Sequence, residues 1–515
     1  MPDPLLWLIP RKADWPREVL LKAAVEIPIQ FNGAAAGTAI VPAGSKVKLV
    51  NILEDSVVID YDGNTTKVPL ASTDLKDQAA AALQRANAAR KTAQMAAQAP
   101  SKQTGAPSPS ASPQNTDAEN MGPAPEDELT ISNGPFVHPG LMHNEEDFKR
   151  MRTHFGQEPW ASGYKKLLAN SHASLGWKQN PQEIVVRGSG PDVRLPQNYP
   201  ALYHDIAAAY ACALRWKISG DPAYAKKSVE IMNVWSSTLK QITGSTDACL
   251  AAGIYGYQFA NAAEIMRTYR GWKPEDFARF QKMMLDVFYP INKRFLERHN
   301  GTKIDHYWAN WDLCNMCSML AIGVLGDKRG LYNDAVRYFK HGAGNGSIRC
   351  AVYYVHPGGL GQWQESGRDQ GHNTLGISLM GAFCEMAWKQ GDDLYGYDNN
   401  RFLTGCEYVA KYNLGYDVPY KPYSNCDVKQ EIISDNGRGT MRPGWELVYN
   451  HYVKRKGLSA PFTKEITEKV RPEGGGGDYG PNSGGFDQLG YGTLTATLDA
   501  HVAPQKDTPR TSAHW

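Results

Sequence analysis

The stretch from Gly358 to Gln390, GGLGQWQESGRDQGHNTLGISLMGAFCEMAWKQ, decides how the rest of the chain is interpreted. From about Gln364 its apolar residues recur every three or four positions, which is the spacing of one buried helical face. Glu365, Arg368 and His372 stand at the front of this predicted helix, at positions i, i+3 and i+7. These offsets place side chains on one face of a helix. A carboxylate, a guanidinium and an imidazole on one face form a group suited to proton transfer and anion binding.

The same three residues have a simpler explanation. Glu365 and Arg368 could form an ordinary surface ion pair, and His372 could be an inert neighbour. The flanking Gly, Gln and Trp residues are typical of a cleft lining. Both interpretations therefore stay open at this point.

Helical patterns fill the chain from residue 135 to residue 419, and short breakers such as Gly326–Asp327 separate them. The predicted helices span about residues 145–155, 200–219, 222–240, 250–270, 274–297, 307–325, 328–342, 364–390 and 399–414. Consecutive helices with short connections pack as antiparallel pairs. Such pairs, repeated around a circle, form an (α/α) toroid with a central cleft. We expect the Gly-rich tail after Asp427 to pack back onto these helices.

A different pattern occupies residues 1–75, where apolar and polar residues alternate between turn signals such as Asn32–Gly33 and Asp62–Asn64. This alternation predicts a small all-β barrel. The segment PAGSKVKLVNILEDSVVIDYDGNTTKVPL resembles a bacterial SH3-like domain, which would be a structural addition without catalysis. Residues 76–132 read as an Ala/Gln-rich helix followed by a flexible Pro/Ser-rich linker. Residues 133–515 then form the helical domain.

Composition excludes several functions. The formal net charge is +2, from 55 basic and 53 acidic residues, so nothing indicates a nucleic-acid partner. No run of 18 apolar residues occurs, so we expect no membrane insertion. Of the eight cysteines only Cys314 and Cys317 are close, inside an apolar helical pattern, and we interpret them as small buried side chains. We expect no metal and no cofactor, and a secreted or periplasmic location with the signal peptide already removed.

Several separate blocks of the chain together resemble a known family. They lie at residues 141–145, 209–235, 306–327, 365–377, 392–413 and 445–458, and include HYWANWDLCNMCSMLAIGVLGD and ESGRDQGHNTLGI. In this order they look like the alginate-lyase domain of uronate polysaccharide lyases, over about residues 135–500. They are more similar to the glucuronan and mannuronan lyases of family thirty-eight than to the compact alginate lyases of family five. The resemblance implies an (α/α) toroid, no cofactor, and β-elimination on a 1,4-linked uronan, an anionic polysaccharide.

Two family motifs match only in part. The compact alginate lyases carry an Asn-Asn-His block, and here Asn310 matches an asparagine while the histidine is absent. Their Glu-x-x-Arg motif matches Glu365 and Arg368, but Leu375 stands where the family has a catalytic tyrosine. His372 lies one turn before Leu375 and is the candidate for the missing proton-transfer group.

The chemistry explains why these residue types are needed. Elimination removes the weakly acidic C5 proton of a uronic acid, so the enzyme must neutralise the neighbouring carboxylate. Arg368 and Asn310 can do this with a guanidinium fork and an amide. A neutral His372 can take the proton, and a tyrosine can protonate the leaving oxygen. The further catalytic candidates are Tyr354, His451 and Tyr452, and the candidate substrate-binding residues are Glu365, Gln362, Trp311, Tyr449 and His204.

Structural explanations compete with some of these roles. The YNHY run at 449–452 could be packing at a junction of elements, and His204 could be a satisfied core histidine. Asp312 and Asp369 adjoin the site and are expected to orient the Asn310 and Arg368 groups. Two other functions stay open, namely a glycoside hydrolase using Asp312 and Glu365 as its carboxylate pair, and a non-catalytic glycan-binding protein. The sequence leaves open which uronan is cleaved and which residue is base or acid.

Overall fold

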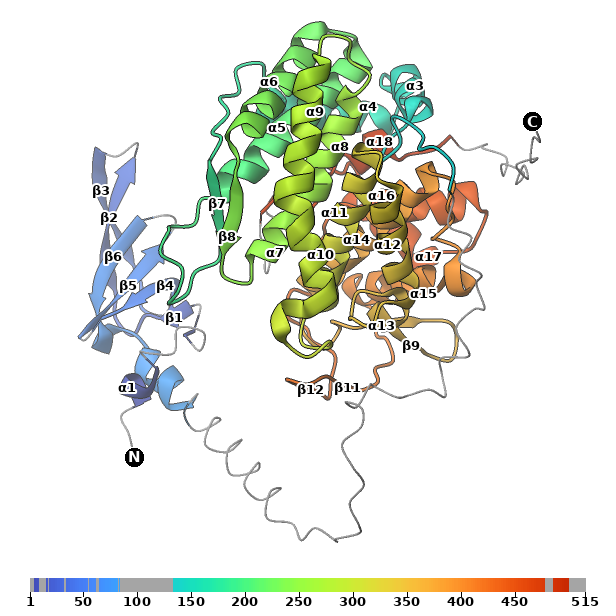
Figure 1. The fold of residues 1–515 in the computed structure, drawn as a ribbon. Coiled ribbons are helices and arrows are strands. Elements are labelled where there is room, and N and C mark those ends of the chain that lie inside the picture. The colour runs from blue at the N-terminus through green and yellow to red at the C-terminus, as the bar shows by residue number, and fades with distance from the viewer. Residues whose placement is uncertain are drawn as a thin grey trace, which may run out of the picture. The chain divides into compact units, whose positions relative to one another are not determined.

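The chain forms two compact units, Met1–Ser112 and Pro113–Trp515. The structure, a computed structural model, describes residues 4–8, 15–16, 18–31, 34–53, 55–61, 64–81, 83, 133–477 and 485–499 (Figure 1). Three parts of the sequence predictions lie outside the described residues: the turns at 32–33 and 62–63, the linker at 84–132, and residues 478–484 of the Gly-rich tail.

The N-terminal unit is built from short antiparallel strands. A four-stranded sheet has the order β1 (Glu18–Leu20), β4 (Lys46–Ile52), β5 (Ser56–Tyr61) and β6 (Asn64–Pro69). A separate hairpin pairs β2 (Val25–Phe31) with β3 (Ala34–Val41). Along β4, Val47, Leu49 and Ile52 point inward, and a register shift between Leu49 and Asn51 changes the alternation. These side chains belong to a core of their own, which the helix at residues 75–81 also covers.

The second unit is mainly helical. Its principal helices are α3 (Glu145–His154), α4 (Trp160–Ala169), α5 (Pro200–Ser219), α6 (Pro222–Thr238), α8 (Gly256–Met266), α9 (Pro274–Met283), α10 (Tyr289–Arg298), α11 (Ala309–Leu325), α12 (Arg329–His341), α14 (Gln370–Lys389), α15 (Tyr397–Asn413), α16 (Trp445–Tyr449), α17 (Pro461–Val470) and α18 (Gly492–Thr495). Short π-helical segments η4 (Ala251–Tyr255), η5 (Met284–Phe288) and η7 (Asn450–Arg455) adjoin α8, α10 and α16. None of the described helices is long and apolar enough to cross a bilayer.

The inner helices contact one another in a closed circuit. α5 packs on α8, α8 on α11, α11 on α14, α14 on α16, α16 on α18, α18 on α3, and α3 returns to α5. A second set lies against this circuit, with α6 on α5, α12 on α11, α15 on α14 and α17 on α16. The helical part of the sequence prediction is confirmed, and the C-terminal tail contributes α16 and α18 to the circuit itself.

The connection between α5 and α6 shows how the sequence sets these helix pairs. Gly220 ends α5 with a left-handed backbone (φ +75°), a conformation in which a side chain is strained. Asp221 then caps α6, because its Oδ1 accepts the Ala223 N–H at 2.9 Å. Two residues therefore stop one helix and start its antiparallel partner.

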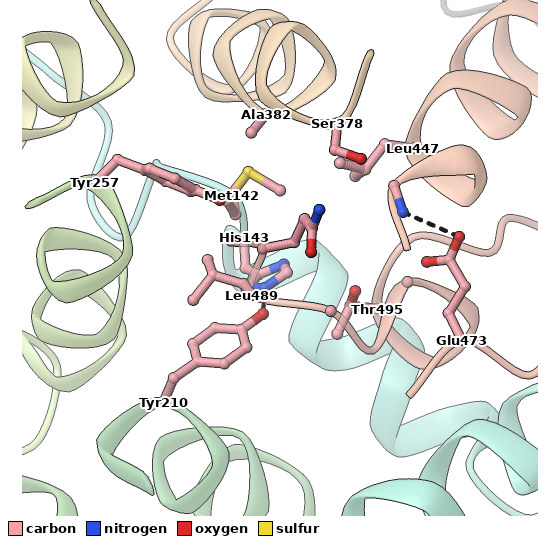
Figure 2. Close-up of a pocket in the computed structure, with 14 residues that line it drawn as sticks. Met142, His143, Tyr210, Tyr257, Ser378, Ala382, Leu447, Glu473, Leu489 and Thr495 are labelled. Carbon is pink, nitrogen blue, oxygen red and sulfur yellow. Dashed lines mark hydrogen bonds between the residues drawn. The ribbon is translucent and has the colours of Figure 1, made fainter. Parts of the chain in front are cut away.

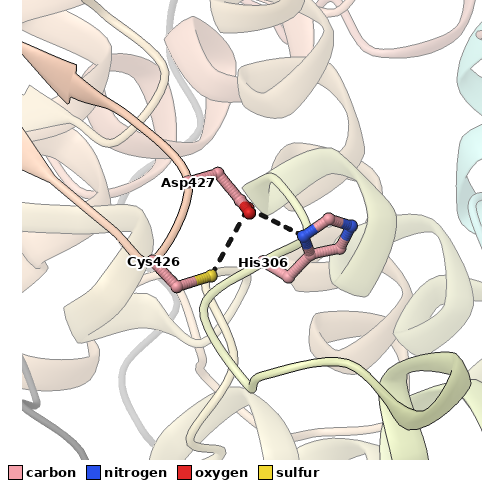
Figure 3. Close-up of side chains that lie close together, drawn as sticks. All are labelled: His306, Cys426 and Asp427. Atoms are coloured by element: carbon pink, nitrogen blue, oxygen red, sulfur yellow. Dashed lines mark hydrogen bonds and ion pairs between the residues drawn. The ribbon is translucent and has the colours of Figure 1, made fainter.

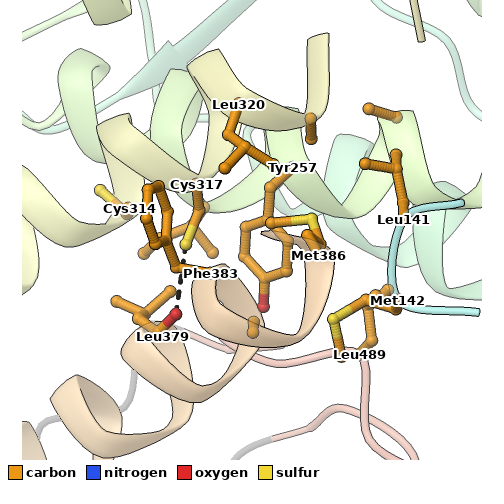
Figure 4. Packing of buried hydrophobic residues seen from close by; sticks show 14 of the residues in the cluster. Leu141, Met142, Tyr257, Cys314, Cys317, Leu320, Leu379, Phe383, Met386 and Leu489 are labelled. Atoms are coloured by element: carbon orange, nitrogen blue, oxygen red, sulfur yellow. Dashed lines mark hydrogen bonds between the residues drawn. The ribbon is translucent and has the colours of Figure 1, made fainter. Parts of the chain in front are cut away.

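Helices α11 and α14 pack against each other within the hydrophobic core (Figure 4). Every residue of α11 is buried. The Cys317 thiol donates to the Leu379 carbonyl of α14 at 3.2 Å, and burial raises its pKa. A Cβ at Gly253 would lie 2.4 Å from the Cys314 sulfur, so this close approach requires glycine. The interpretation of Cys314 and Cys317 as packing residues is confirmed, and all eight cysteines are free.

The prediction of a helix beginning at Gln364 was wrong. Strand β10 (Gly361–Trp363) pairs with β9 (Val352–Val355), a turn follows, and α14 begins only at Gln370. The physical reason is the cap: the Asp369 side chain accepts the His372 N–H at 2.8 Å and stops the helix from extending backward. Glu365 and Arg368 therefore lie in a turn, and of the three residues only His372 is helical.

Candidate active site

The N-terminus of α11 is capped by another part of the chain. Trp308 occupies the N-cap position without a side-chain hydrogen bond. Instead, the Ala309 N–H donates to Gln364 Oε1 and the Asn310 N–H donates to Glu365 Oε1, both at 3.1 Å. A carboxylate is favourable there because the N-terminal end of a helix carries partial positive charge. These bonds fix the turn before α14 against the first turn of α11.

Glu365 also holds Arg368. Its Oε2 accepts from Arg368 Nη1 at 2.6 Å, and Glu365 is 0 % exposed while the arginine side chain is 25 % exposed. The guanidinium lies 5.0 Å from the centre of the Trp308 ring. Its Nε is 3.7 Å from Asp369 Oδ2, too far for a hydrogen bond. Arg368 is thus fixed at one corner and keeps further N–H donors for a ligand.

His372 is oriented by Asp369. Its Nδ1 lies 2.7 Å from Asp369 Oδ2, and the ring is partly exposed. Burial alone would raise the pKa of Asp369, but the hydrogen bonds from His372 and the nearby Arg368 lower it overall, so the carboxylate is ionised. An ionised carboxylate can only accept, so Nδ1 carries the proton in the neutral ring. Nε2, which has no partner among the described residues, is then free to accept a proton.

Asn310 lies directly beside this group. Its N–H is bonded to Glu365, while its side-chain Oδ1 is buried without a hydrogen-bond partner among the described residues. The structure therefore brings together Asn310, Glu365, Arg368 and His372, the central residues of the sequence prediction. Asp369 was expected to orient the Arg368 group, but its side-chain hydrogen bonds go to His372.

The sequence reasoning missed two aromatic residues at this site. Trp308 lies under the Arg368 guanidinium, and Tyr423 accepts a hydrogen bond from Gln364 Nε2 at 2.7 Å. Trp308 could have been found, because it belongs to the same sequence block as Asn310. Tyr423 gives no local signal, since 59 residues separate it from Gln364.

Tyr354 and Gln362 lie on the β9–β10 hairpin. The Gln362 amide is committed to the fold, because its nitrogen donates to the Tyr353 hydroxyl and its oxygen accepts the Lys421 N–H. Tyr354 is half-buried, and the Lys421 ammonium lies 4.3 Å from its ring centre. The neighbouring Tyr353 is the one whose ring contacts Tyr423, at 5.2 Å between ring centres.

Trp311 and His204 lie in other surroundings. The Trp311 ring is buried against Phe295 and Tyr307, as expected for a core residue. His204 Nδ1 lies 2.9 Å from His172 Nε2, and burial lowers the pKa of both rings, to about 4 for His172. Both histidines are neutral at pH 7, and among the described residues neither contacts Arg368 or His372.

Tyr449, His451 and Tyr452 belong to α16 and η7. His451 stacks on Tyr395 with 3.8 Å between ring centres, and burial beside Arg455 lowers its pKa to about 3. The Tyr452 hydroxyl is buried and donates to the Tyr395 carbonyl at 2.7 Å. The Tyr449 ring packs near the charged end of Lys454. Among the described residues none of these three contacts His372, and their surroundings agree with the packing explanation.

Asp312 does not orient Asn310. Its Oδ1 lies 2.7 Å from His299 Nε2, and its Oδ2 accepts the Gly346 N–H at 2.9 Å. Asp312 and Glu365 are both 0 % exposed, and both carboxylates are held by protein donors. A hydrolytic pair needs one carboxyl that reaches the glycosidic oxygen and one that reaches water or the sugar. This arrangement does not provide such a pair.

A cavity inside the circuit of helices lies apart from these residues (Figure 2). Its polar lining includes His143, Tyr210, Glu473 and Gln488. The His143 ring nitrogen Nε2 is 2.6 Å from the Tyr210 hydroxyl. Burial, together with the charge of Glu446, raises the pKa of Glu473 to about 8, so this carboxyl is protonated at neutral pH. The cavity includes neither Arg368 nor His372.

The class of the protein follows from comparison with known proteins. The family model described as alginate lyase matches residues 78–417, about two thirds of the chain. The protein is a polysaccharide lyase. The chain belongs to the alginate lyase family. No match was found among curated proteins.

Two solved structures are similar to the chain. Alginate lyase A1-III from Sphingomonas species A1 is 14 % identical, with a TM-score of 0.47, and the match covers 72 % of this chain and 99 % of that one. An alginate lyase from Bacteroides ovatus is 13 % identical, with a TM-score of 0.47, over 70 % of this chain and 100 % of that one. Similarity this low does not allow residues to be transferred from either structure.

Proposed function

We propose that this protein cleaves a 1,4-linked uronic-acid polymer, alginate (mannuronan) or glucuronan, by β-elimination and leaves unsaturated uronate ends. The observation that carries the proposal is the Asp369–His372 pair beside Arg368. A carboxylate that accepts from Nδ1 leaves Nε2 of the neutral ring as a proton acceptor. The guanidinium of Arg368, which the Glu365 carboxylate holds in place, belongs to a residue four positions before His372.

In this mechanism the substrate carboxylate binds first. Arg368 donates hydrogen bonds from the edge of its guanidinium that Glu365 does not occupy. The Asn310 amide contributes a second contact, which is uncharged. Their hydrogen bonds strengthen as negative charge develops on the carboxylate during loss of the C5 proton. Because Glu365 balances the arginine charge, binding depends more on hydrogen-bond geometry than on net charge.

His372 then takes the C5 proton at Nε2. Asp369 holds the ring in one tautomer and stabilises the imidazolium that forms. The bond between C4 and its oxygen breaks, and the electron pair left at C5 forms the C4–C5 double bond. The leaving oxygen takes up a proton, either from the imidazolium or from a nearby tyrosine hydroxyl.

The finer parts of the proposal rest on particular features. The closed circuit of helices supports an (α/α) toroid. The antiparallel sheet and hairpin of residues 18–69 support a small barrel of the SH3-like type. The placement near family thirty-eight, and with it a preference for glucuronan or mannuronan, rests on the sequence blocks alone. We propose a secreted or periplasmic enzyme that needs no cofactor for the elimination.

The test is a panel of polymers incubated with the purified protein and followed by near-ultraviolet absorbance, which reports the new double bond. We expect the absorbance to rise with polymannuronate or glucuronan as the substrate. Mass spectrometry should find products that are lighter than the corresponding hydrolysis products by one water molecule. Reducing ends that appear without absorbance would mean hydrolysis. Tight binding without turnover on every polymer would mean a non-catalytic glycan-binding protein. Either result would overturn the proposal.

A further inference from the structure

Three side chains with metal-ligand chemistry lie together outside the proposed active site (Figure 3). His306 is in the loop between η6 (His299–Gly301) and α11. Cys426 and Asp427 are in the turn of the hairpin formed by β11 (Tyr423–Ser424) and β12 (Lys429–Gln430). The structure thus brings one nitrogen, one sulfur and one carboxylate oxygen from two distant segments to within 4.8 Å of one another.

Two of the three separations between these atoms can be compared with those of a tetrahedral site. Metal–ligand distances of about 2.0–2.3 Å place tetrahedral ligands about 3.3–3.6 Å apart. Cys426 Sγ lies 3.4 Å from Asp427 Oδ2, and His306 Nδ1 lies 2.7 Å from the same oxygen. The second distance would have to open by about 0.6–0.9 Å to admit an ion with ligands at these distances. The side chains of His306 and Asp427 are 39 % and 45 % exposed, so they have room to do so.

The charges around Cys426 also favour a cation. Asp305 accepts the Cys426 N–H at 3.0 Å, so a second carboxylate adjoins the sulfur. Asp427 is the other carboxylate, because its Oδ2 accepts from Cys426 Sγ at 3.4 Å. A dication at this position would balance the charge of both carboxylates.

We propose that His306 Nδ1, Cys426 Sγ and Asp427 Oδ2 bind one zinc ion, with water as the fourth ligand. Sulfur and imidazole ligands favour zinc over calcium or magnesium, which prefer oxygen. The ion would join the loop before α11 to the β11–β12 hairpin, and we therefore expect it to stabilise this connection. These two segments carry Trp308 and Tyr423, the aromatic residues beside Arg368 and Gln364. The site is independent of the proposed elimination, in which the ion takes no part.

The test uses the full chain freed of metal with a chelator and titrated with Co²⁺, which replaces zinc and reports its ligands by colour. We expect one Co²⁺ per chain, a thiolate-to-cobalt charge-transfer band, displacement by one equivalent of Zn²⁺, and a higher melting temperature with Zn²⁺. Cys426→Ser should abolish the band and weaken zinc binding at least tenfold, more than loss of a residue that only supports a ligand. Cys350→Ser, a change at a half-buried cysteine outside the cluster, is the matched control and should keep the band.

Several outcomes would overturn the proposal. They are failure of the unsubstituted protein to bind Co²⁺ or Zn²⁺, binding without the charge-transfer band, or a band that survives Cys426→Ser. The first two do not depend on the folding of any variant. His306→Ala should weaken binding while the cobalt–thiolate band remains at saturating metal, which separates loss of a ligand from loss of the fold. None of these readouts uses catalytic activity, so failure here leaves the proposed elimination unaffected.

Discussion

Arg368→Ala tests a residue to which we assign two roles. Arg368 is the only cation bonded to the buried Glu365 carboxylate among the described residues. Removing one partner of a buried ion pair costs about 3–5 kcal/mol of folding stability. Because the arginine side chain is 25 % exposed, water screens the pair and we expect the lower end, about 3 kcal/mol. The substrate fork is lost as well, and kcat/KM should fall by at least about 10²-fold, the value of one transition-state donor.

A double variant separates these two losses. Glu365→Gln removes the buried charge but keeps an oxygen that can accept the Asn310 N–H. The pair Glu365→Gln with Arg368→Ala should therefore regain most of the lost stability. Activity should stay low, because no guanidinium returns. Denaturant melts followed by tryptophan fluorescence measure the first quantity, and the near-ultraviolet lyase assay measures the second.

The two measurements can contradict the reasoning separately. If the double variant regains activity together with stability, Arg368 only supports the fold and the uronate binds elsewhere. If Arg368→Ala loses less than about 1 kcal/mol of folding stability, the pair behaves like an exposed one. Glu365, which is 0 % exposed, would then not carry a buried charge that depends on Arg368.

The other predictions concern separate features. His372→Ala should lower kcat by about 10²–10⁴-fold with little change in substrate affinity and should remove one limb of the pH–rate profile; retention of a tenth of the activity would assign proton transfer elsewhere. A chain that begins at Asn133 should keep its turnover on short oligosaccharides, and a folded but inactive chain would mean that the N-terminal unit completes the site. Dialysis against a chelator should leave turnover unchanged well below the melting temperature, and a loss restored by calcium would contradict a metal-free elimination. The pKa of Glu473 is raised from 4.5 to about 8, so its contribution to stability is full below pH 4.5 and is lost between about pH 4.5 and 8. The melting temperature of Glu473→Gln should therefore rise relative to that of the unsubstituted protein as the pH increases across this range. Equal slopes of melting temperature against pH for the two proteins would refute the assignment.

Periodicity was sufficient to predict most of the helical unit. The prediction for residues 200–219 coincides with α5, and those for α6, α11, α12 and α15 differ by a few residues at their ends. These helices have apolar faces over several turns and are bounded by Gly, Asp or Pro. The segment at 364–369 was misassigned because its composition permits a helix, while a single cap at Asp369 determines where the helix begins.

The site was predicted in its composition but not in its geometry. Glu365 and Arg368 meet at the predicted i, i+3 separation, although a turn and not a helix brings them together. Contacts between distant segments leave no trace in local sequence. Tyr423 reaches Gln364 across 59 residues, and Asp427 reaches His306 across 121 residues. For the same reason, ligand spacing along the sequence did not reveal the proposed zinc site.

The first turn of helix α11 takes two hydrogen-bond acceptors from a distant segment, and we expect this to affect the order of folding. The acceptors for its first two N–H groups lie 55 residues away, on Gln364 and Glu365. Closing a loop of this length costs entropy before the contact returns any free energy. The helical signal in circular dichroism should therefore return early on refolding, since most of α11 forms without the cap. Catalytic activity should return only in the last phase. In that phase the turn before α14 docks on α11 and brings Asn310 and Arg368 together in a single step.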